Sequence, residues 1–316
     1  MPSSEHTLLA EEYDDALVET ANNENIAFLA LIAPNYPVNI TPSRSAFAQI
    51  GINEEYAVRK AIKMIKENSN TDKLFFLINS PGGIVQSSYI IAHALQESFK
   101  EITVFIPHIA ASGATLISLV GKHVVMDGLI SRISPLDPQI TYKGEYKSVN
   151  TIIRSFKNLN AYFGDMHEDD SPYPSKVLAD KHDPVNLQEC FDTIDLMSMY
   201  ALNVLAHKNN RYVRYNENIP LEEDLKTVKG MVEKFLSLEY PLHEYAILAN
   251  EVKEIGLNVY DVSKIEDIES LHNEFNNTIN FKHAWQEIVD WFEKYKDIPS
   301  ANHFVRYIVP LRENGT

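Results

Sequence analysis

Two glycine-containing turns carry the residues best suited to chemistry in this chain. The first, Ile78–Gly83, has the sequence Ile-Asn-Ser-Pro-Gly-Gly, and the second, Ala110–Ala114, has the sequence Ala-Ala-Ser-Gly-Ala. A glycine loop can present free backbone N–H groups to a developing oxyanion, and a serine at a strand-to-helix junction can act as a nucleophile. The pair predicts acyl-transfer chemistry, with Ser112 as the nucleophile. The backbone N–H groups of Gly82, Gly83 and Gly113 are the expected oxyanion donors.

The elements around these turns predict an α/β fold. Apolar runs bounded by turn residues predict buried strands at residues 26–32, 73–79, 102–107 and 124–126, and helical periodicity predicts helices at 53–67, 87–99 and 112–120. The alternation of strand and helix is typical of a mainly parallel sheet with right-handed crossovers. Ligands of such sheets bind at the carboxyl ends of the strands, where both glycine turns are expected.

The remaining segments suggest further units. Residues 1–25 form an acidic N-terminal tail, either loose or a short helix, and the main domain is expected at 26–262 with an insertion or lid at 143–185. Helices are expected at 183–207 and 226–238, a polar loop at 215–225, and a strand at 257–259 after a helix that ends at Gly256. Residues 263–316 read as a C-terminal extension of amphipathic helices.

Composition excludes several classes of protein. Lys plus Arg is 28 and Asp plus Glu is 44, so the net charge of −16 argues against nucleic acid as a partner. A single cysteine, Cys190, excludes an internal disulfide and clustered Cys/His metal sites. No secretory signal or membrane span is expected, which favours a cytoplasmic protein. No nucleotide-binding glycine motif is present, so we expect no cofactor. We also expect no metal site.

The two turns resemble those of the Clp protease/crotonase superfamily, and a closer similarity is to the serine dehydrogenase proteinase family, relatives of signal peptide peptidase A. Four separated motifs in the same order carry this resemblance: the first turn; Pro107, His108, Ala110, Ser112, Gly113, Thr115, Leu116 and Ile117; Met126-Asp127 with Pro135, Asp137, Pro138 and Gln139; and Tyr240, Pro241, His243, Glu251, Gly256 and Leu257. It covers residues 26–262 and implies a Clp/crotonase-like repeated β-β-α spiral.

The resemblance leaves the general base open. Where Clp subunits carry the catalytic histidine this chain has Asp137, and His243 lies in the neighbourhood where they carry the aspartate. One hypothesis is therefore a triad of Ser112, His243 and Asp137, since triads are defined by geometry rather than chain order. The other is a Ser–Lys dyad like that of signal peptide peptidase A relatives, with Lys143 or Lys147 as the base. His108 is expected to be a hydrogen-bonded structural residue.

Serine peptidase activity on extended peptides or unfolded proteins is the function that the resemblance implies. It also implies a homo-oligomer, trimer-based or a ring, and any ATP dependence would require a separate ATPase or regulatory partner. Two alternatives from other classes stay open: a crotonase-type acyl-CoA enzyme, which would bind CoA and not need Ser112, and a catalytically silent scaffold that keeps the fold for binding.

Overall fold

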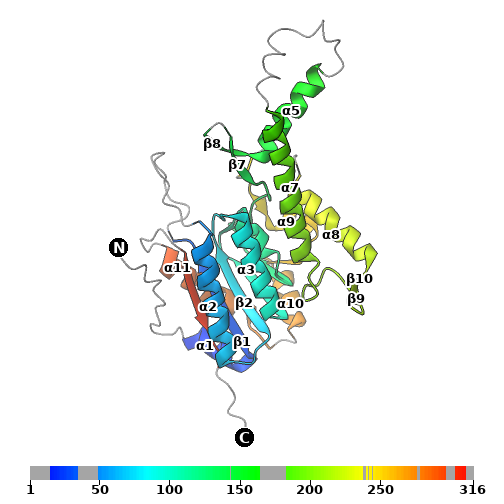
Figure 1. The fold of residues 1–316 in the computed structure, drawn as a ribbon. Coiled ribbons are helices and arrows are strands. Elements are labelled where there is room, and N and C mark those ends of the chain that lie inside the picture. Colours follow the sequence, from blue (N-terminus) through cyan, green and yellow to red (C-terminus); the bar gives the residue numbers. More distant parts are fainter. Residues whose placement is uncertain are drawn as a thin grey trace, which may run out of the picture.

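A computed structural model describes residues 15–34, 49–142, 144–163, 183–237, 240, 242–243, 245–275, 278–296 and 303–310. Its centre is a six-stranded sheet in the order β12-β5-β3-β2-β1-β13 (Figure 1). The strands are β1 (Ile26–Ile32), β2 (Lys73–Asn79), β3 (Glu101–Ile106), β5 (His123–Met126), β12 (Val259–Asp261) and β13 (Phe304–Ile308). All neighbours pair in parallel except β1 and β13, which are antiparallel. The predicted α/β architecture with a mainly parallel sheet is confirmed.

Both faces of this sheet are covered, which explains why its strands are continuously apolar. In β2, Phe76 and Ile78 point into one core, whereas Phe75 and Leu77 point into the other, as the alternation of a strand requires. The first core packs against α2 (Ile52–Asn68), α3 (Val85–Ser98), α4 (Gly113–Ser118), α7 (Pro184–Leu205), α8 (Glu222–Phe235) and α9 (Ala249–Ile255). The second packs against α1 (Asp15–Glu24), α10 (Ile265–Glu274) and α11 (Phe281–Lys296).

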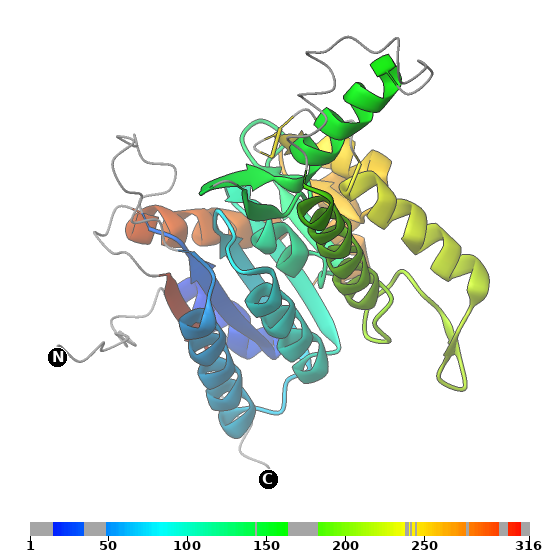
Figure 2. The same ribbon diagram turned by 45° about the horizontal axis from the view of Figure 1, so that its top comes forward.

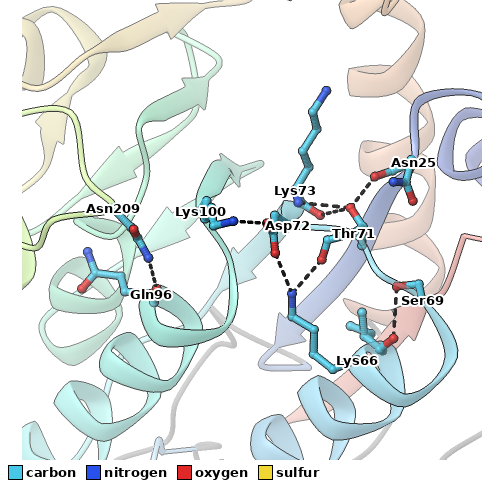
Figure 3. Close-up of polar contacts among 10 residues, drawn as sticks. Asn25, Lys66, Ser69, Thr71, Asp72, Lys73, Gln96, Lys100 and Asn209 are labelled. Atoms are coloured by element: carbon cyan, nitrogen blue, oxygen red, sulfur yellow. Dashed lines mark hydrogen bonds and ion pairs between the residues drawn. The ribbon is translucent and has the colours of Figure 1, made fainter.

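A polar network fixes the edge at which the central strands begin (Figure 3). Asp72, directly before β2, accepts hydrogen bonds from Lys100 at 2.6 Å and from Lys66 at 3.4 Å. Thr71 donates to the backbone oxygen of Asn25, directly before β1. The hydrogen bond from Lys100 holds the pKa of Asp72 below its ordinary value, with a further contribution from Lys66 and some opposition from burial. Because parallel strands share their direction, this edge lies at the opposite end of the sheet from the glycine turns.

The predicted insertion at 143–185 begins inside a hairpin of β7 (Gln139–Tyr142) and β8 (Glu145–Ser148), followed by α5 (Val149–Phe163). The side chains of Ile140, Ile152 and Cys190 share a small third core, which joins the hairpin to α5 and α7. In Figures 1 and 2, α5 and the N-terminal part of α7 extend away from the main sheet. Residues 164–182 of the predicted insertion lie outside the described residues.

The described parts of both chain ends pack against the main sheet. Leu17 and Ala21 of α1 are fully buried in the second core, so the described part of the acidic segment is a packed helix rather than a loose tail. The C-terminal extension contains the predicted amphipathic helices, but its residues 304–308 form β13, which completes the sheet beside β1. The strand β13 was not predicted, because a five-residue strand beside a single partner has only a short apolar pattern.

Smaller differences concern the second half of the main domain. The predicted polar loop at 215–225 contains a hairpin of β9 (Tyr215–Asn216) and β10 (Ile219–Pro220) and the start of α8. The strand predicted at 257–259 is β12, displaced by two residues to Val259–Asp261. Gly256 ends α9 with a φ of +119°, as predicted, because this left-handed conformation favours glycine. None of the described helices is both long and apolar enough to cross a membrane.

Candidate active site

A small three-stranded sheet brings the three predicted triad segments to one edge. It consists of β4 (Ile109–Ala110), β6 (Arg132–Ile133) and β11 (Ile247–Leu248), in the order β11-β6-β4. The strands β4 and β6 are parallel, and β11 is antiparallel to β6. The end of β4, the end of β6 and the start of β11 therefore meet. Ser112 follows β4, Asp137 follows β6, and His243 precedes β11.

The nucleophile turn holds Ser112 in an unusual backbone conformation. Its φ is +52° and its ψ is −117°, a region that costs a non-glycine residue about 1–3 kcal/mol and is maintained only by surrounding contacts. The Ser112 N–H donates to the Ser134 hydroxyl at 2.7 Å. Thr115 donates to the backbone oxygens of Ala110 and Ser134, at 2.8 Å and 3.0 Å. These bonds fasten the strained turn between β4 and α4, and they leave the Ser112 side chain partly exposed.

The glycine loop is fixed by backbone bonds on two sides. The Ile50 N–H donates to the Gly82 oxygen and the Ile50 oxygen accepts from the Ile84 N–H, both at 2.8 Å. On the other side, Ser80 exchanges backbone bonds with Ile109 and Ala111, at 2.9 Å and 3.0 Å. The glycine loop therefore lies between the segment before α2 and the Ser112 turn, and it forms strand-like backbone hydrogen bonds with both.

Side chains at the three glycines would collide with neighbouring atoms. A Cβ on Gly82, whose φ is +93°, would lie 2.4 Å from the Ala111 oxygen, and a Cβ on Gly83 would lie 2.2 Å from the Ile50 oxygen. A Cβ on Gly113 would lie 2.2 Å from the Ser88 hydroxyl and 3.3 Å from the Gly83 nitrogen. The two turns thus approach each other at backbone distance, which requires glycine at these positions.

The three predicted oxyanion donors are not equivalent. The Gly82 N–H already donates to the buried Ser80 hydroxyl, at 3.0 Å. Within the described part of the chain, the N–H groups of Gly83 and Gly113 have no hydrogen-bond acceptor. The geometry therefore leaves Gly83 and Gly113 as the available donors and gives Gly82 the role of shaping the loop.

Ser112, Gly82, Gly83 and His243 line one pocket of about 410 Å³. Its other walls come from the segment before α2, the start of α3 and the β7–β8 hairpin: Gln49, Pro81, Ile84, Val85, Pro138, Gln139 and Tyr146. The candidate nucleophile, the glycine loop and one candidate base therefore share a cavity that is large enough for a side chain and its flanking backbone.

Asp137 and His243 interact through charge. Asp137 is 3% exposed, accepts from the Ser148 hydroxyl at 2.5 Å and accepts from the Asn150 N–H at 3.1 Å. Burial raises the pKa of Asp137; these two hydrogen bonds and a positive charge at His243 oppose the shift. The Nδ1 atom of His243 is buried and has no hydrogen-bond partner among the described residues. The histidine thus lies within the field of the carboxylate, with one ring nitrogen unused.

Lys147 is the candidate lysine that lies among the described residues, and it does not line the pocket. Lys147, in β8, is 47% exposed in its side chain and pairs with Glu145 at 2.6 Å. Its neighbour Tyr146 lines the pocket, and successive side chains of a strand point to opposite faces, so Lys147 points away from it. Lys143 lies outside the described residues. His108 contacts Arg132 through its Nε2 atom at 3.1 Å, as expected for a structural histidine.

Sequence reasoning missed two groups that support these turns. The Ser134 hydroxyl accepts the hydrogen bond from the Ser112 N–H, and a hydroxyl directly before the Pro-x-Asp-Pro motif was the available signal. His303 lies 2.7 Å from the Ser80 hydroxyl through its Nε2 atom, although 223 positions separate the two residues in sequence. No local pattern indicates such a contact.

Comparison with known proteins agrees with this geometry. Residues 12–161 match the family model of ClpP-like SDH-type serine proteinases. This part of the chain is similar to that family. The match includes the glycine loop, the Ser112 turn and Asp137, but it ends before His243.

The similar proteins have no assigned activity in their names. The chain is 26% identical over 255 residues to the uncharacterized protein MJ0137 of Methanocaldococcus jannaschii, covering 81% of this chain and 75% of that protein. It is 35% identical over 103 residues to the uncharacterized protein MJ1495 of the same organism, covering 33% of each chain. No cluster of potential metal ligands occurs among the described residues.

Proposed function

We propose that this chain is a serine peptidase that acts through an acyl-enzyme on Ser112. The observation that carries the proposal is the strained Ser112 turn, which faces a pocket shared with His243 and with the loop of the unpaired Gly83 N–H. Strain at a serine between a strand and a helix is a recurrent property of nucleophile turns in hydrolases.

In the proposed reaction, the Ser112 Oγ attacks the carbonyl carbon of a peptide bond and transfers its proton to His243. The N–H groups of Gly83 and Gly113 stabilise the resulting oxyanion. Collapse of this intermediate breaks the C–N bond, and His243 returns the proton to the leaving amine. Water then repeats the sequence on the acyl-enzyme and releases the acid. Ionised Asp137 stabilises the imidazolium by charge in both halves.

An extended peptide is the substrate that best fits the pocket. The glycine loop and residues 138–139 both line the pocket, and the N–H of Gly83 is free to pair with a peptide backbone. Strand addition of this kind recognises the main chain, while pockets recognise alternate side chains. Ile84 and Tyr146 are exposed on these walls and would favour an apolar side chain next to the cleaved bond.

Labelling with a fluorophosphonate, followed by mass spectrometry of the modified peptide, tests the nucleophile. We expect one label on Ser112 and none in Ser112→Ala. His243→Ala should label at least about 100-fold more slowly, because general-base catalysis contributes factors of this size. His283→Ala, which removes an exposed histidine from α11, is the matched control and should label at the wild-type rate.

The same experiment separates the alternatives. Undiminished labelling in His243→Ala together with loss in Lys147→Ala or Lys143→Ala would replace the triad with a dyad. Failure of the wild-type chain to label at Ser112 and to cleave an unfolded protein would overturn the proposed activity and favour a binding scaffold. Tight binding of CoA would instead favour the acyl-CoA enzyme.

A further inference from the structure

A buried chain of polar contacts connects the C-terminal segment to the glycine loop. The side chain of His303, which directly precedes β13, is fully buried. Its Nε2 atom lies 2.7 Å from the Ser80 hydroxyl, and that hydroxyl accepts the hydrogen bond from the Gly82 N–H at 3.0 Å. A histidine close to the end of the chain is thus two hydrogen bonds away from the oxyanion loop.

Glu54 continues this chain on the other side of the histidine. Its Oε1 atom lies 3.5 Å from His303 Nδ1, and its Oε2 atom accepts from the Gly51 N–H at 2.9 Å. Burial raises the pKa of Glu54, but its interaction with His303 and the backbone hydrogen bond from Gly51 lower it, and the net result lies below the ordinary value. Glu54 is therefore a carboxylate, and it also anchors the segment next to Ile50, which pairs with the loop.

The carboxylate sets the direction of the hydrogen bonds. A proton on His303 Nδ1 faces Glu54, which leaves Nε2 as the acceptor of the Ser80 hydroxyl proton. The lone pairs of Ser80 Oγ then remain for the Gly82 N–H. In this tautomer the Ser80 hydroxyl both donates and accepts, whereas His303 Nδ1, 3.5 Å from Glu54, faces the carboxylate without a hydrogen bond.

The order of acid, histidine and serine is that of a catalytic triad, but the serine is inaccessible. Ser80 is 0% exposed and Glu54 is 5% exposed, so no substrate reaches this hydroxyl. The other hydrogen bond of the Ser80 hydroxyl is structural. This hydroxyl accepts from the Gly82 N–H and so directs that N–H toward the protein interior and away from the pocket. The next donor along the loop, the Gly83 N–H, is left without an acceptor beside the Gly113 turn.

We propose that His303 is a positioning residue for the oxyanion hole, held in place by the docking of β13 against β1. The inference rests on the proposed peptidase function of Ser112. Docking of β13 against β1 places His303 beneath the loop; His303 orients Ser80, Ser80 holds Gly82, and Gly82 sets the direction of the Gly83 N–H. Loss of His303 should mainly slow the chemical step, because the donor acts on the oxyanion.

The experiment compares His303→Ala with two matched variants in the full chain. His303→Gln keeps an amide that can accept or donate at the same reach. Val305→Ala shortens a β13 side chain packed against the first core and leaves the histidine in place, so it controls for general loosening of the strand. Cleavage of an unfolded protein gives kcat and KM, and amide hydrogen exchange at Gly82 reports the loop directly.

We expect His303→Ala to lower kcat by about 10-fold to 100-fold with KM nearly unchanged, in line with the effect of misplacing a catalytic group by about 1 Å. Its Gly82 amide should exchange at least about 10-fold faster than in the wild type, because Ser80 is no longer oriented to accept its hydrogen bond. His303→Gln should recover part of both effects. Val305→Ala should lower the melting temperature and leave both readouts near the wild-type values. Ser80→Ala should reproduce the kcat loss of His303→Ala.

Two results would overturn the inference. One is unchanged Gly82 exchange in a folded His303→Ala variant, which decides the matter whether or not the chain is a peptidase. The other is faster exchange with an unchanged kcat. Absence of Ser112 labelling in the wild type would instead refute the proposed function, and the exchange measurement alone would then decide whether His303 positions the loop.

Discussion

Replacement of Gly83 by alanine tests the role of the glycine loop most directly. The added Cβ would lie 2.2 Å from the Ile50 oxygen and 2.3 Å from the Ile50 nitrogen, and both atoms belong to the backbone. No side-chain rotation relieves such contacts, so the loop and the segment before α2 must separate. The Gly83 N–H, a proposed oxyanion donor, would move with the loop.

The structure gives the size of the expected effect. Separation of the two segments weakens the Ile50 bonds to Gly82 and Ile84, and each backbone bond contributes about 1 kcal/mol net. We therefore expect Gly83→Ala to lower the free energy of unfolding by about 2 kcal/mol. Loss of one well-placed oxyanion donor lowers kcat by about 100-fold to 1,000-fold.

Gly230→Ala is the matched control. A Cβ at Gly230, inside α8, meets no atom within 4 Å, and alanine is the better helix former by about 0.5–1 kcal/mol. This variant should be slightly more stable and fully active. Urea denaturation and fluorophosphonate labelling of Ser112 measure the two effects separately. Labelling of Gly83→Ala at the wild-type rate, in folded protein, would refute the assignment of the loop as the oxyanion hole.

Three further outcomes follow from the described contacts. Gly113→Ala should slow labelling at Ser112, and Ser88→Ala in the same chain should recover part of the rate, because the new Cβ meets the Ser88 hydroxyl at 2.2 Å. Ser134→Ala should lower the free energy of unfolding by about 1–2 kcal/mol and slow labelling, because the Ser112 N–H loses its acceptor. Burial, with a smaller contribution from the charge of Arg211 and opposition from Glu274, lowers the pKa of His123 to about 4. As the pH falls below about 6.5, the unfolded chain binds a proton at His123 while the folded chain does not, so the free energy of unfolding decreases. Between pH 7.5 and pH 4.5, the wild type should lose about 2.5 kcal/mol more of its free energy of unfolding than His123→Phe does. Urea denaturation at the two pH values measures this difference.

The main sheet was predictable from the sequence because its strands are covered on both faces. Continuous apolar runs such as 26–32 and 73–79 reproduce β1 and β2 residue for residue. The glycines of the two turns were equally informative, since the close approach of two backbones excludes a side chain. Where burial on both faces of a sheet or a close backbone contact restricts the residue type, the local sequence is enough to predict the structure.

The small sheet that assembles the site left no such record. Its strands β4, β6 and β11 have two residues each, too few for any periodicity. Proximity of Asp137 and His243 to Ser112 was therefore a hypothesis based on family resemblance. The strand β13 and His303 were missed for a related reason, because their pairing depends on residues far away in the sequence.

The direction of the parallel strands separates stability from chemistry in this fold. Their starting edge carries the network of Asp72, Lys100 and Thr71, with side chains that contact no pocket residue. Their carboxyl edge carries the strained Ser112 and loops that leave N–H groups unpaired, an arrangement that costs stability and persists only because neighbouring elements fix it. His303 reaches this edge because β13 runs antiparallel to β1 and so begins where the parallel strands end. An added parallel strand would place its first residue at the other edge, so the reversed direction of β13 is what brings the C-terminal segment beneath the oxyanion loop.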